Sequence, residues 1–155
     1  MDGECGMYKI KWISPGKNID SALDVRFEVF VHEQHFVDEV DALDSVAHHV
    51  VLFDEQDRPF ATGRVFEDSG APGTYIIGRV AVKKHMRSSG LGSVIMENLE
   101  QRAAELGAVS IVLGAQLQAK PFYEKLGYAP TGEEYYEQDC PHVKMKKDLS
   151  KYLPS

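Results

Sequence analysis

Cysteine is scarce in this sequence: the chain has two, Cys5 and Cys140, which lie far apart. Two distant cysteines provide neither a disulfide framework nor the paired spacing of a zinc site. We therefore expect a protein of a reducing compartment, the cytoplasm. No apolar run approaches the roughly 20 residues that span a bilayer, and the N-terminus lacks a charged segment followed by an apolar one. We expect neither a membrane span nor a signal peptide.

Positive charge is also in deficit. The sequence has 17 Lys and Arg against 24 Asp and Glu, a formal net charge of −7. Nucleic acid and anionic lipid would repel such a chain as a whole, so we expect neither as a partner. One short basic segment, KKHMR at residues 83–87, stands out from the acidic remainder.

The composition that is present is typical of a globular domain. The 155 residues, 43% of them hydrophobic and 26% charged, are enough for one domain with a proper core. We expect a single domain over residues 1–155, with residues 1–6 forming a disordered or vector-derived tail.

Periodicity divides the chain into strands and helices. Apolar alternation, β-branched content and turn-forming stretches predict strands, and helical spacing with capping signals predicts helices. Strands are expected at residues 8–13, 48–54, 60–67, 74–82, 109–114, 128–136 and 141–148. Helices are expected at residues 20–33, 90–106 and 121–127.

The strand at residues 109–114, VSIVLG, is an almost unbroken apolar run. Such a run is expected where both faces of a sheet are covered, as after a strand-helix-strand crossover with parallel pairing. We therefore expect the strands at residues 74–82 and 109–114 to be parallel. We expect the fold class to be α/β (α+β).

A loop with the sequence RSSGLG, residues 87–92, precedes the long helix. Unpaired N–H groups and the positive end of the helix dipole favour a phosphate there, and Arg87 adds a charged fork. Gly90 and Gly92 allow close approach of a ligand to the backbone. No Gly-Lys-Ser/Thr follows, and Ile95 stands where a dinucleotide fingerprint needs glycine. A purely structural helix cap is the alternative to anion binding.

Two other patterns fail as chemical sites. The histidines of HEQH, His32 and His35, are three apart rather than four and have no evident third ligand, so this is not a zinc motif. Cys140 has no accompanying Cys-His-Asp pattern and is expected to be a free thiol. We expect no metal.

The segment RVAVKKHMRSSGLGSVIMENLEQRA resembles the acetyl-CoA-binding core of the GNAT family of N-acetyltransferases. The signature of that family is Gln/Arg-x-x-Gly-x-Gly/Ala, which Arg87, Gly90 and Gly92 match. Further along, QLQAKPFYEKLGYAPTG resembles the second motif of the family, Asn-x-x-Ala-x-x-Phe-Tyr followed by Gly-Phe or Gly-Tyr, with Gln116 in the place of Asn. The other residues in register are Ala119, Phe122, Tyr123, Gly127 and Tyr128.

Two further segments, VRFEVFVHEQHFVDEVDALD and GEEYYEQDCPHVKM, resemble the ElaA-like branch of this family. The resemblance implies a GNAT-like fold with a mixed central sheet of about six to seven strands, an ordinary size, and helices on both faces. It also implies that the parallel strands at residues 74–82 and 109–114 splay apart to admit the pantetheine arm of acetyl-CoA. Gly78 is compatible with a bulge in the first of them, since glycine often marks such irregularities.

The resemblance also assigns residues to acetyl-CoA. Backbone groups of residues 80–82 are expected to bind the pantetheine, to polarise the thioester carbonyl and to stabilise the oxyanion, and residues 87–92 are expected to hold the pyrophosphate. The expected acetyl-CoA-binding residues are Val80, Ala81, Val82, Arg87, Ser88, Ser89, Gly90, Leu91, Gly92, Gln116, Ala119 and Phe122.

The activity that the resemblance implies is transfer of an acetyl group from acetyl-CoA to a primary amine, of a small molecule rather than a peptide, by direct attack in a ternary complex. Tyr123 matches the family's usual proton donor to the departing thiolate, and a phenol with a pKa of about 10 is protonated at neutral pH. A core aromatic is the alternative interpretation of Tyr123, because Phe122 and Leu126 define an apolar face of the same short helix.

The proton acceptor for the amine is less well defined. Glu33, at the end of the first helix, is the leading candidate for a catalytic base. It belongs with Glu39, Asp41 and Asp44 to an acidic stretch that either attracts a cationic amine or is a solvated loop. Weaker candidates, each more often a satisfied core residue than a base, are His48, His49 and His142.

Other functions stay open at the level of sequence. A noncatalytic acyl-CoA-binding sensor or interaction module is the alternative to an enzyme. Transfer of a longer acyl chain, or transfer to a hydroxyl, depends on the width of a channel that the sequence does not give. The protein is a monomer or a homodimer, because an exposed edge strand and an internal pairing look alike in sequence.

Overall fold

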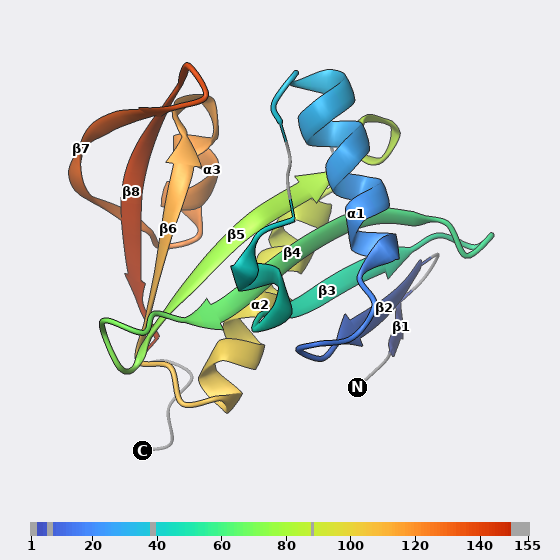
Figure 1. The fold of residues 1–155 in the computed structure, drawn as a ribbon, viewed down its shortest axis with the longest axis horizontal. Helices are drawn as coiled ribbons and strands as arrows, with labels where there is room; N and C mark the ends of the chain where they lie inside the picture. Colours follow the sequence, from blue (N-terminus) through green and yellow to red (C-terminus); the bar gives the residue numbers. More distant parts are fainter. Residues whose placement is uncertain (1–2, 6–7, 38–39, 88, 150–155) are drawn as a thin grey trace. The chain divides into compact units, whose positions relative to one another are not determined.

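The computed structural model describes residues 3–5, 8–37, 40–87 and 89–149 (Figure 1). The chain forms two compact units. The first unit consists of Met1–Phe66 and Arg79–Leu99, and the second of Glu67–Gly78 and Glu100–Ser155. Two strands and one long helix begin in one unit and end in the other, and the units are described in turn.

Four strands of the first unit follow one another as antiparallel neighbours. They are β1 (Gly3–Cys5), β2 (Tyr8–Ile13), β3 (His48–Phe53) and β4 (Pro59–Glu67). Residues 3–5, part of the segment predicted to be a disordered or vector-derived tail, form β1, which pairs with the edge of β2 and satisfies backbone groups that an edge strand leaves open.

The last part of β5 (Thr74–Val82) follows β4 in the first unit. Just beyond the strand, the N–H of Lys83 donates a hydrogen bond to the carbonyl of Phe60 over 2.8 Å. Within β5 the backbone of Arg79 has a φ of 52°. A non-glycine residue rarely adopts this left-handed conformation, so Arg79 marks an irregularity beside Gly78, where the sequence predicts a bulge.

The predicted first helix is present, but it changes character halfway. Helix α1 (Asp20–Arg26) continues directly into a π-helix, η1 (Phe27–Glu33). Val25 and Val29 from this pair of helices form a buried cluster with Ala81 of β5. The pair therefore covers the sheet face on which the Ala81 side chain lies.

Helix α2 (Leu91–Glu105) begins in the first unit and covers the other face (Figure 1). A Cβ atom added at Gly63 of β4 would lie 2.7 Å from Leu99 and 3.4 Å from Val80, so these side chains share one face. Successive strand residues point to opposite faces, which separates Val80 from Ala81. Helices on both faces of the sheet are thus confirmed.

The second unit contains the parallel pair that the sequence predicts. Residues 74–76 of β5 pair in parallel with residues 110–112 of β6 (Ser110–Gln116). The order continues with β8 and then β7, both in antiparallel pairing. The remaining elements are η4 (Leu117–Ala119), α3 (Lys120–Lys125), β7 (Ala129–Glu137) and β8 (Cys140–Asp148).

The described residues thus form eight strands, the seven predicted and β1. The mixed sheet and its parallel pair are confirmed as predicted. The core of the first unit is built on β3 and β4, with Val50, Leu52 and Phe60 almost completely buried. The core of the second unit includes Ile111 and Met145.

Candidate functional site

The loop predicted to bind an anion joins a short 3₁₀ turn, η3 (Lys84–Met86), to the start of α2. Gly90 has a φ of 74°, which favours glycine, and an added Cβ atom would meet no atom within 4 Å. Ser89 and Gly90 are exposed, Leu91 is buried, and Ser88 lies outside the described residues. The first N–H groups of a helix have no partner within the helix, so this loop presents backbone donors beside open space.

The side chain of Arg87 is held at two points. Its Nε donates a hydrogen bond to the carbonyl of Val82 over 2.8 Å. Its two Nη atoms donate to the two carboxylate oxygens of Glu33, over 2.6 and 2.5 Å. The structure therefore brings together two residues to which the sequence assigns separate roles, an anion-binding arginine and a catalytic base.

Both members of this pair are partly open to solvent, with side-chain exposures of 36% for Arg87 and 35% for Glu33. The hydrogen bonds from Arg87, assisted by the charges of Arg87 and Lys84, lower the pKa of Glu33. In return, the hydrogen bond to Glu33 raises the pKa of Arg87. Glu33 is thus an ionised carboxylate with reduced basicity.

Residues 80–82 occupy the end of β5 beside this loop. Ala81 is buried, whereas Val80 and Val82 are half-buried. The carbonyl of Val82 accepts the hydrogen bond from Arg87. The next residue, Lys83, donates to Asp24 of α1 over 2.7 Å. The basic segment at residues 83–87 is therefore partly neutralised by carboxylates of α1 and η1.

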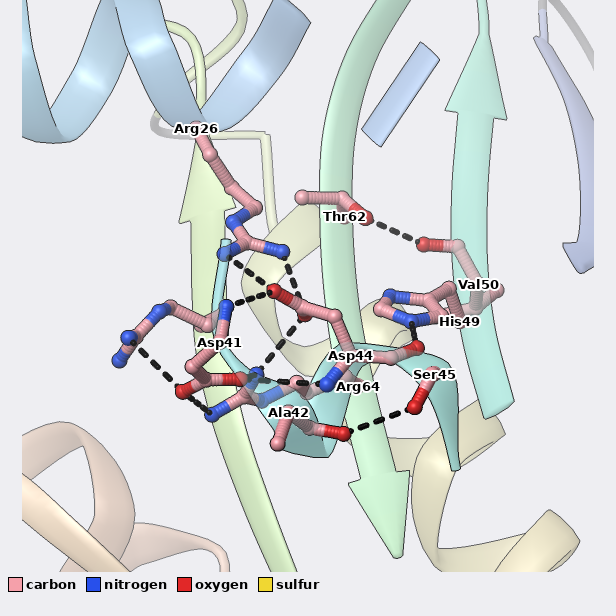
Figure 2. A network of polar contacts seen from close by, with 10 residues as sticks. Arg26, Asp41, Ala42, Asp44, Ser45, His49, Val50, Thr62 and Arg64 are labelled. Atoms are coloured by element: carbon pink, nitrogen blue, oxygen red, sulfur yellow. Dashed lines mark hydrogen bonds and ion pairs between the residues drawn. The ribbon is translucent and has the colours of Figure 1, made fainter. Parts of the chain in front are cut away.

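Asp41 and Asp44, two carboxylates of the acidic stretch after η1, belong to an ion-pair network and not to an open anionic surface (Figure 2). Arg26 of α1 donates to both carboxylate oxygens of Asp44, over 2.9 and 3.2 Å. Arg64 of β4 donates to Asp44 and to Asp41, each over 2.8 Å. Asp44 is 4% exposed, so its charge is not available to an incoming amine. Glu39 lies outside the described residues.

Hydrogen bonds within this network keep the carboxylates of Asp41 and Asp44 ionised. Asp41 and Asp44 each accept a hydrogen bond from the backbone N–H of the other, over 3.1 Å, at the start of η2 (Ala42–Ser45). Burial alone would raise the pKa of Asp44, but the hydrogen bonds from Arg26 and the Asp41 N–H, with the nearby positive charges, lower it. The hydrogen bond from Arg64 likewise lowers the pKa of Asp41.

Two of the histidine candidates for the base are held by backbone carbonyls. His49 is 1% exposed and its Nε2 lies 3.1 Å from the carbonyl of Asp44. Burial lowers its pKa. His142 is also buried, and its Nδ1 lies 2.8 Å from the carbonyl of Cys140. Both fit the core interpretation, while His48 is half-buried.

In the second unit, Tyr123 lies on α3 among other aromatic residues. Its ring meets Phe122 edge to face at 5.0 Å and Tyr128 at 5.9 Å between ring centres. Burial raises the pKa of Tyr123 to about 12. The phenol therefore keeps its proton at neutral and moderately alkaline pH.

A buried carboxylate, Glu100, contacts one member of this aromatic cluster and was not predicted from the sequence. Glu100 of α2, 2% exposed, accepts hydrogen bonds from the Tyr128 hydroxyl over 2.7 Å and from Lys147 over 2.9 Å. The ammonium of Lys147 also lies 5.5 Å from the centre of the Tyr128 ring. Strand alternation was the available signal, because it places Lys147 on the buried face with Val143 and Met145.

The remaining predicted residues lie on the segment that runs from the end of β6 into α3. Gln116 ends β6 and accepts a hydrogen bond from Gln118. Ala119 immediately precedes α3, and Phe122 is half-buried on that helix. Over the described part of the chain, no group of three or more His, Cys, Asp or Glu residues is arranged to hold a metal ion. No described helix is long and apolar enough to cross a membrane.

Comparison with known proteins places the chain in a family. A model described as an acetyltransferase (GNAT) domain matches residues 18–149. The uncharacterized N-acetyltransferase YjcF of Bacillus subtilis (strain 168) is 38% identical over 135 residues, which are 85% of this chain and 94% of YjcF. The chain therefore belongs to the GNAT acetyltransferase family.

Solved structures agree with this assignment. An acyl-CoA N-acyltransferase from Pseudomonas aeruginosa is similar with a TM-score of 0.80 and 28% identity, over 90% of this chain and 99% of that chain. ElaA of Escherichia coli is similar with a TM-score of 0.77 and 25% identity, over 90% and 99% of the two chains. The protein is an acyl-CoA-dependent acyltransferase, and the predicted GNAT fold and likeness to ElaA are confirmed.

Proposed function

We propose that this protein transfers an acetyl group from acetyl-CoA to the primary amine of a small molecule, by direct attack in a ternary complex. The main support for the proposal is the position of Arg87 at the start of the loop that precedes α2. Its Nε donates a hydrogen bond to the carbonyl of Val82. In that loop Gly90 leaves the backbone accessible. Arg87, Gly90 and Gly92 stand at the positions of the family signature.

These residues fit the phosphate end of acetyl-CoA. Backbone N–H groups at a helix N-terminus and an arginine fork are both suited to a pyrophosphate. In the proposed complex, Ser88, Ser89 and Leu91 complete the phosphate loop, and residues 80–82 pair with the pantetheine through their backbone groups. Gln116, Ala119 and Phe122 are proposed to border the same substrate.

The chemistry requires one bond to form and one to break. The neutral amine nitrogen attacks the thioester carbonyl carbon and gives up one proton. The carbon-sulfur bond then breaks, and the departing thiolate takes up one proton, so that the amide and free CoA are formed. A backbone N–H of residues 80–82 directed at the carbonyl oxygen would stabilise the negative charge that develops there.

Tyr123 is proposed as the donor of the proton to the thiolate. Its phenol is protonated over the whole neutral range because burial raises its pKa to about 12. The aromatic contacts with Phe122 and Tyr128 restrict the orientation of its ring. A raised pKa also makes the phenol a weaker acid, so its contribution depends on contact with the departing sulfur.

Glu33 stays a prediction as the proton acceptor for the amine, and its contact with Arg87 weighs against that role. A carboxylate whose pKa is lowered is a weaker base. If Arg87 holds the pyrophosphate, a side chain on its guanidinium lies at the phosphate end of acetyl-CoA, which the pantetheine arm separates from the thioester. Residence in the cytoplasm and a monomeric or homodimeric state likewise stay predictions.

Thermal unfolding with and without acetyl-CoA tests the proposal. A ligand that binds only the folded state, at a hundredfold its dissociation constant, adds about 2.7 kcal/mol to the free energy of unfolding. We expect a higher melting temperature with acetyl-CoA and with desulfo-CoA, and a much smaller change with ATP. No shift with either CoA compound would mean that residues 87–92 are only a helix cap.

A further inference from the structure

We infer that Glu33 and the pyrophosphate of acetyl-CoA compete for the guanidinium of Arg87, so that Glu33 weakens the binding of acetyl-CoA. The inference rests on the proposed function, because it assigns Arg87 to the phosphate end of that substrate. It gives Glu33 a definite part in the site that differs from proton abstraction.

The Glu33 carboxylate contacts Arg87 in the way that a bound anion would. Glu33 receives one hydrogen bond from each Nη atom of Arg87, over 2.6 and 2.5 Å, in the two-point arrangement that arginine makes with carboxylates and phosphates alike. The Nε of Arg87 is directed to the carbonyl of Val82. Three of the five N–H donors of a guanidinium are therefore engaged, including the pair that a phosphate would use in the same two-point manner.

The negative charge of Glu33 opposes the binding of a pyrophosphate at Arg87. A carboxylate on the fork and a pyrophosphate in the adjacent loop are like charges, and each favours the absence of the other. The hydrogen bond from Arg87 holds the pKa of Glu33 below its ordinary value, so the carboxylate is fully ionised at neutral pH. Acetyl-CoA must displace it to gain the full two-point contact with Arg87.

The backbone that delivers Glu33 is itself unusual. Glu33 is the last residue of the seven-residue π-helix η1, after which the N–H of Gln34 donates to the carbonyl of Val29, five residues earlier, over 3.1 Å. π-helical turns are rare and are frequent at functional sites. A regular α-helical continuation of α1 would direct the residue at position 33 elsewhere, so the π-helix is what brings Glu33 to Arg87.

The test is the affinity of Glu33→Gln for desulfo-CoA, measured by isothermal titration calorimetry beside the wild type. Loss of a partly exposed ion pair that the ligand must break corresponds to a tightening of about twofold to fivefold. Glu28→Gln is the matched control, because it removes the same charge from the same π-helix but faces Lys83 at 3.8 Å. We expect the control to change the affinity by less than about twofold, because the charge of Glu28 acts on Arg87 without occupying the Nη donors that Glu33 holds and is screened by salt.

Two further binding measurements test whether the effect of Glu33→Gln acts through Arg87 and the phosphates. In an Arg87→Gln background, adding Glu33→Gln should tighten desulfo-CoA binding no more than Glu28→Gln does, since the contested guanidinium is gone. Binding of pantetheine, which has no phosphate, should be the same for wild type and Glu33→Gln. A melting curve of each variant confirms that it is folded.

The outcomes separate the two proposals. Unchanged or weaker desulfo-CoA binding by a folded Glu33→Gln would overturn the competition and make Glu33 a residue that merely positions Arg87. Equal tightening in the presence and absence of Arg87 would also overturn it. Failure of the wild type to bind desulfo-CoA at all would instead overturn the proposed function.

Discussion

Arg26 and Asp44 form a two-point ion pair whose side chains are almost completely buried, with exposures of 1% and 2%. The pair ties α1 to the turn that precedes β3, and Arg64 adds a third buried charge (Figure 2). Removal of one member of such a group leaves the other charges buried without compensation, which is more damaging than loss of an exposed pair.

Replacement of Asp44 by asparagine should therefore destabilise the protein strongly. We expect the free energy of unfolding to fall by about 3–5 kcal/mol, measured by urea denaturation at neutral pH. Asp57→Asn, which breaks the exposed pair with Lys9, is the control and should have little effect. Similar midpoints for the two variants would contradict the structural importance of the buried network.

The same carboxylate predicts a dependence of stability on pH. The folded structure lowers the pKa of Asp44 below its ordinary value of 3.8. The unfolded chain thus binds its proton first as the pH falls, so the stabilisation from Asp44 is present above about pH 4 and is lost below it. Between pH 6 and pH 3, Asp44→Asn should lose less stability than the wild type. Equal losses would show that Asp44 is not the group responsible.

Removal of the Tyr123 hydroxyl should impair turnover. For Tyr123→Phe we expect kcat to fall by about a hundredfold, the lower end of the range for general acid catalysis, with the dissociation constant for acetyl-CoA within about twofold of wild type. Tyr136→Phe, at a residue that is 74% exposed, should change neither quantity. A large loss of affinity with an unchanged kcat would restrict Tyr123 to packing.

Tyr123 should also make the protein less stable at high pH. Its pKa is 10.0 in the unfolded chain and about 12 when folded, so the unfolded state loses its proton first as the pH rises. The contribution of the neutral phenol to the stability of the folded state is complete below pH 10 and is lost as the pH rises from 10 to 12. Tyr123→Phe should show a smaller decline over this interval, and an identical decline would contradict the raised pKa.

The buried Glu100 group should behave as a unit. Glu100→Gln leaves the ammonium of Lys147 buried without its carboxylate, and we expect a loss of about 3–5 kcal/mol in the free energy of unfolding. Adding Lys147→Met should recover a substantial part of that loss, because the uncompensated charge is removed. Additive losses in the double variant would contradict a direct pairing.

The sequence predicted the elements whose patterns are local. The turn-forming stretches between the strands, the apolar run of β6 and the capping signals of α2 all depend on neighbouring residues, and the parallel crossover follows from them. The π-helix is different: the apolar spacing over residues 20–33 fits a regular helix, and nothing in it distinguishes an i→i−5 ladder. Strand β1 escaped prediction because a three-residue edge strand has too short a pattern.

The candidate site shows the same division. Arg87 and the loop glycines were found because their role depends on spacing along the chain. Their contact with Glu33 depends on tertiary structure, since the two residues are far apart in sequence, and the same is true of Asp44 with Arg26 and Arg64. A run of acidic residues therefore looks like a solvated or substrate-attracting stretch until its arginine partners are placed.

The most direct test of the account is the release of free CoA from acetyl-CoA, measured with a thiol reagent, in the presence and absence of a panel of small primary amines. We expect release that depends on the amine, is matched by an equal amount of acetylated amine and is strongly reduced in Tyr123→Phe. Tight binding of acetyl-CoA with no amine-dependent release across the panel would contradict it and would favour a noncatalytic acyl-CoA-binding module.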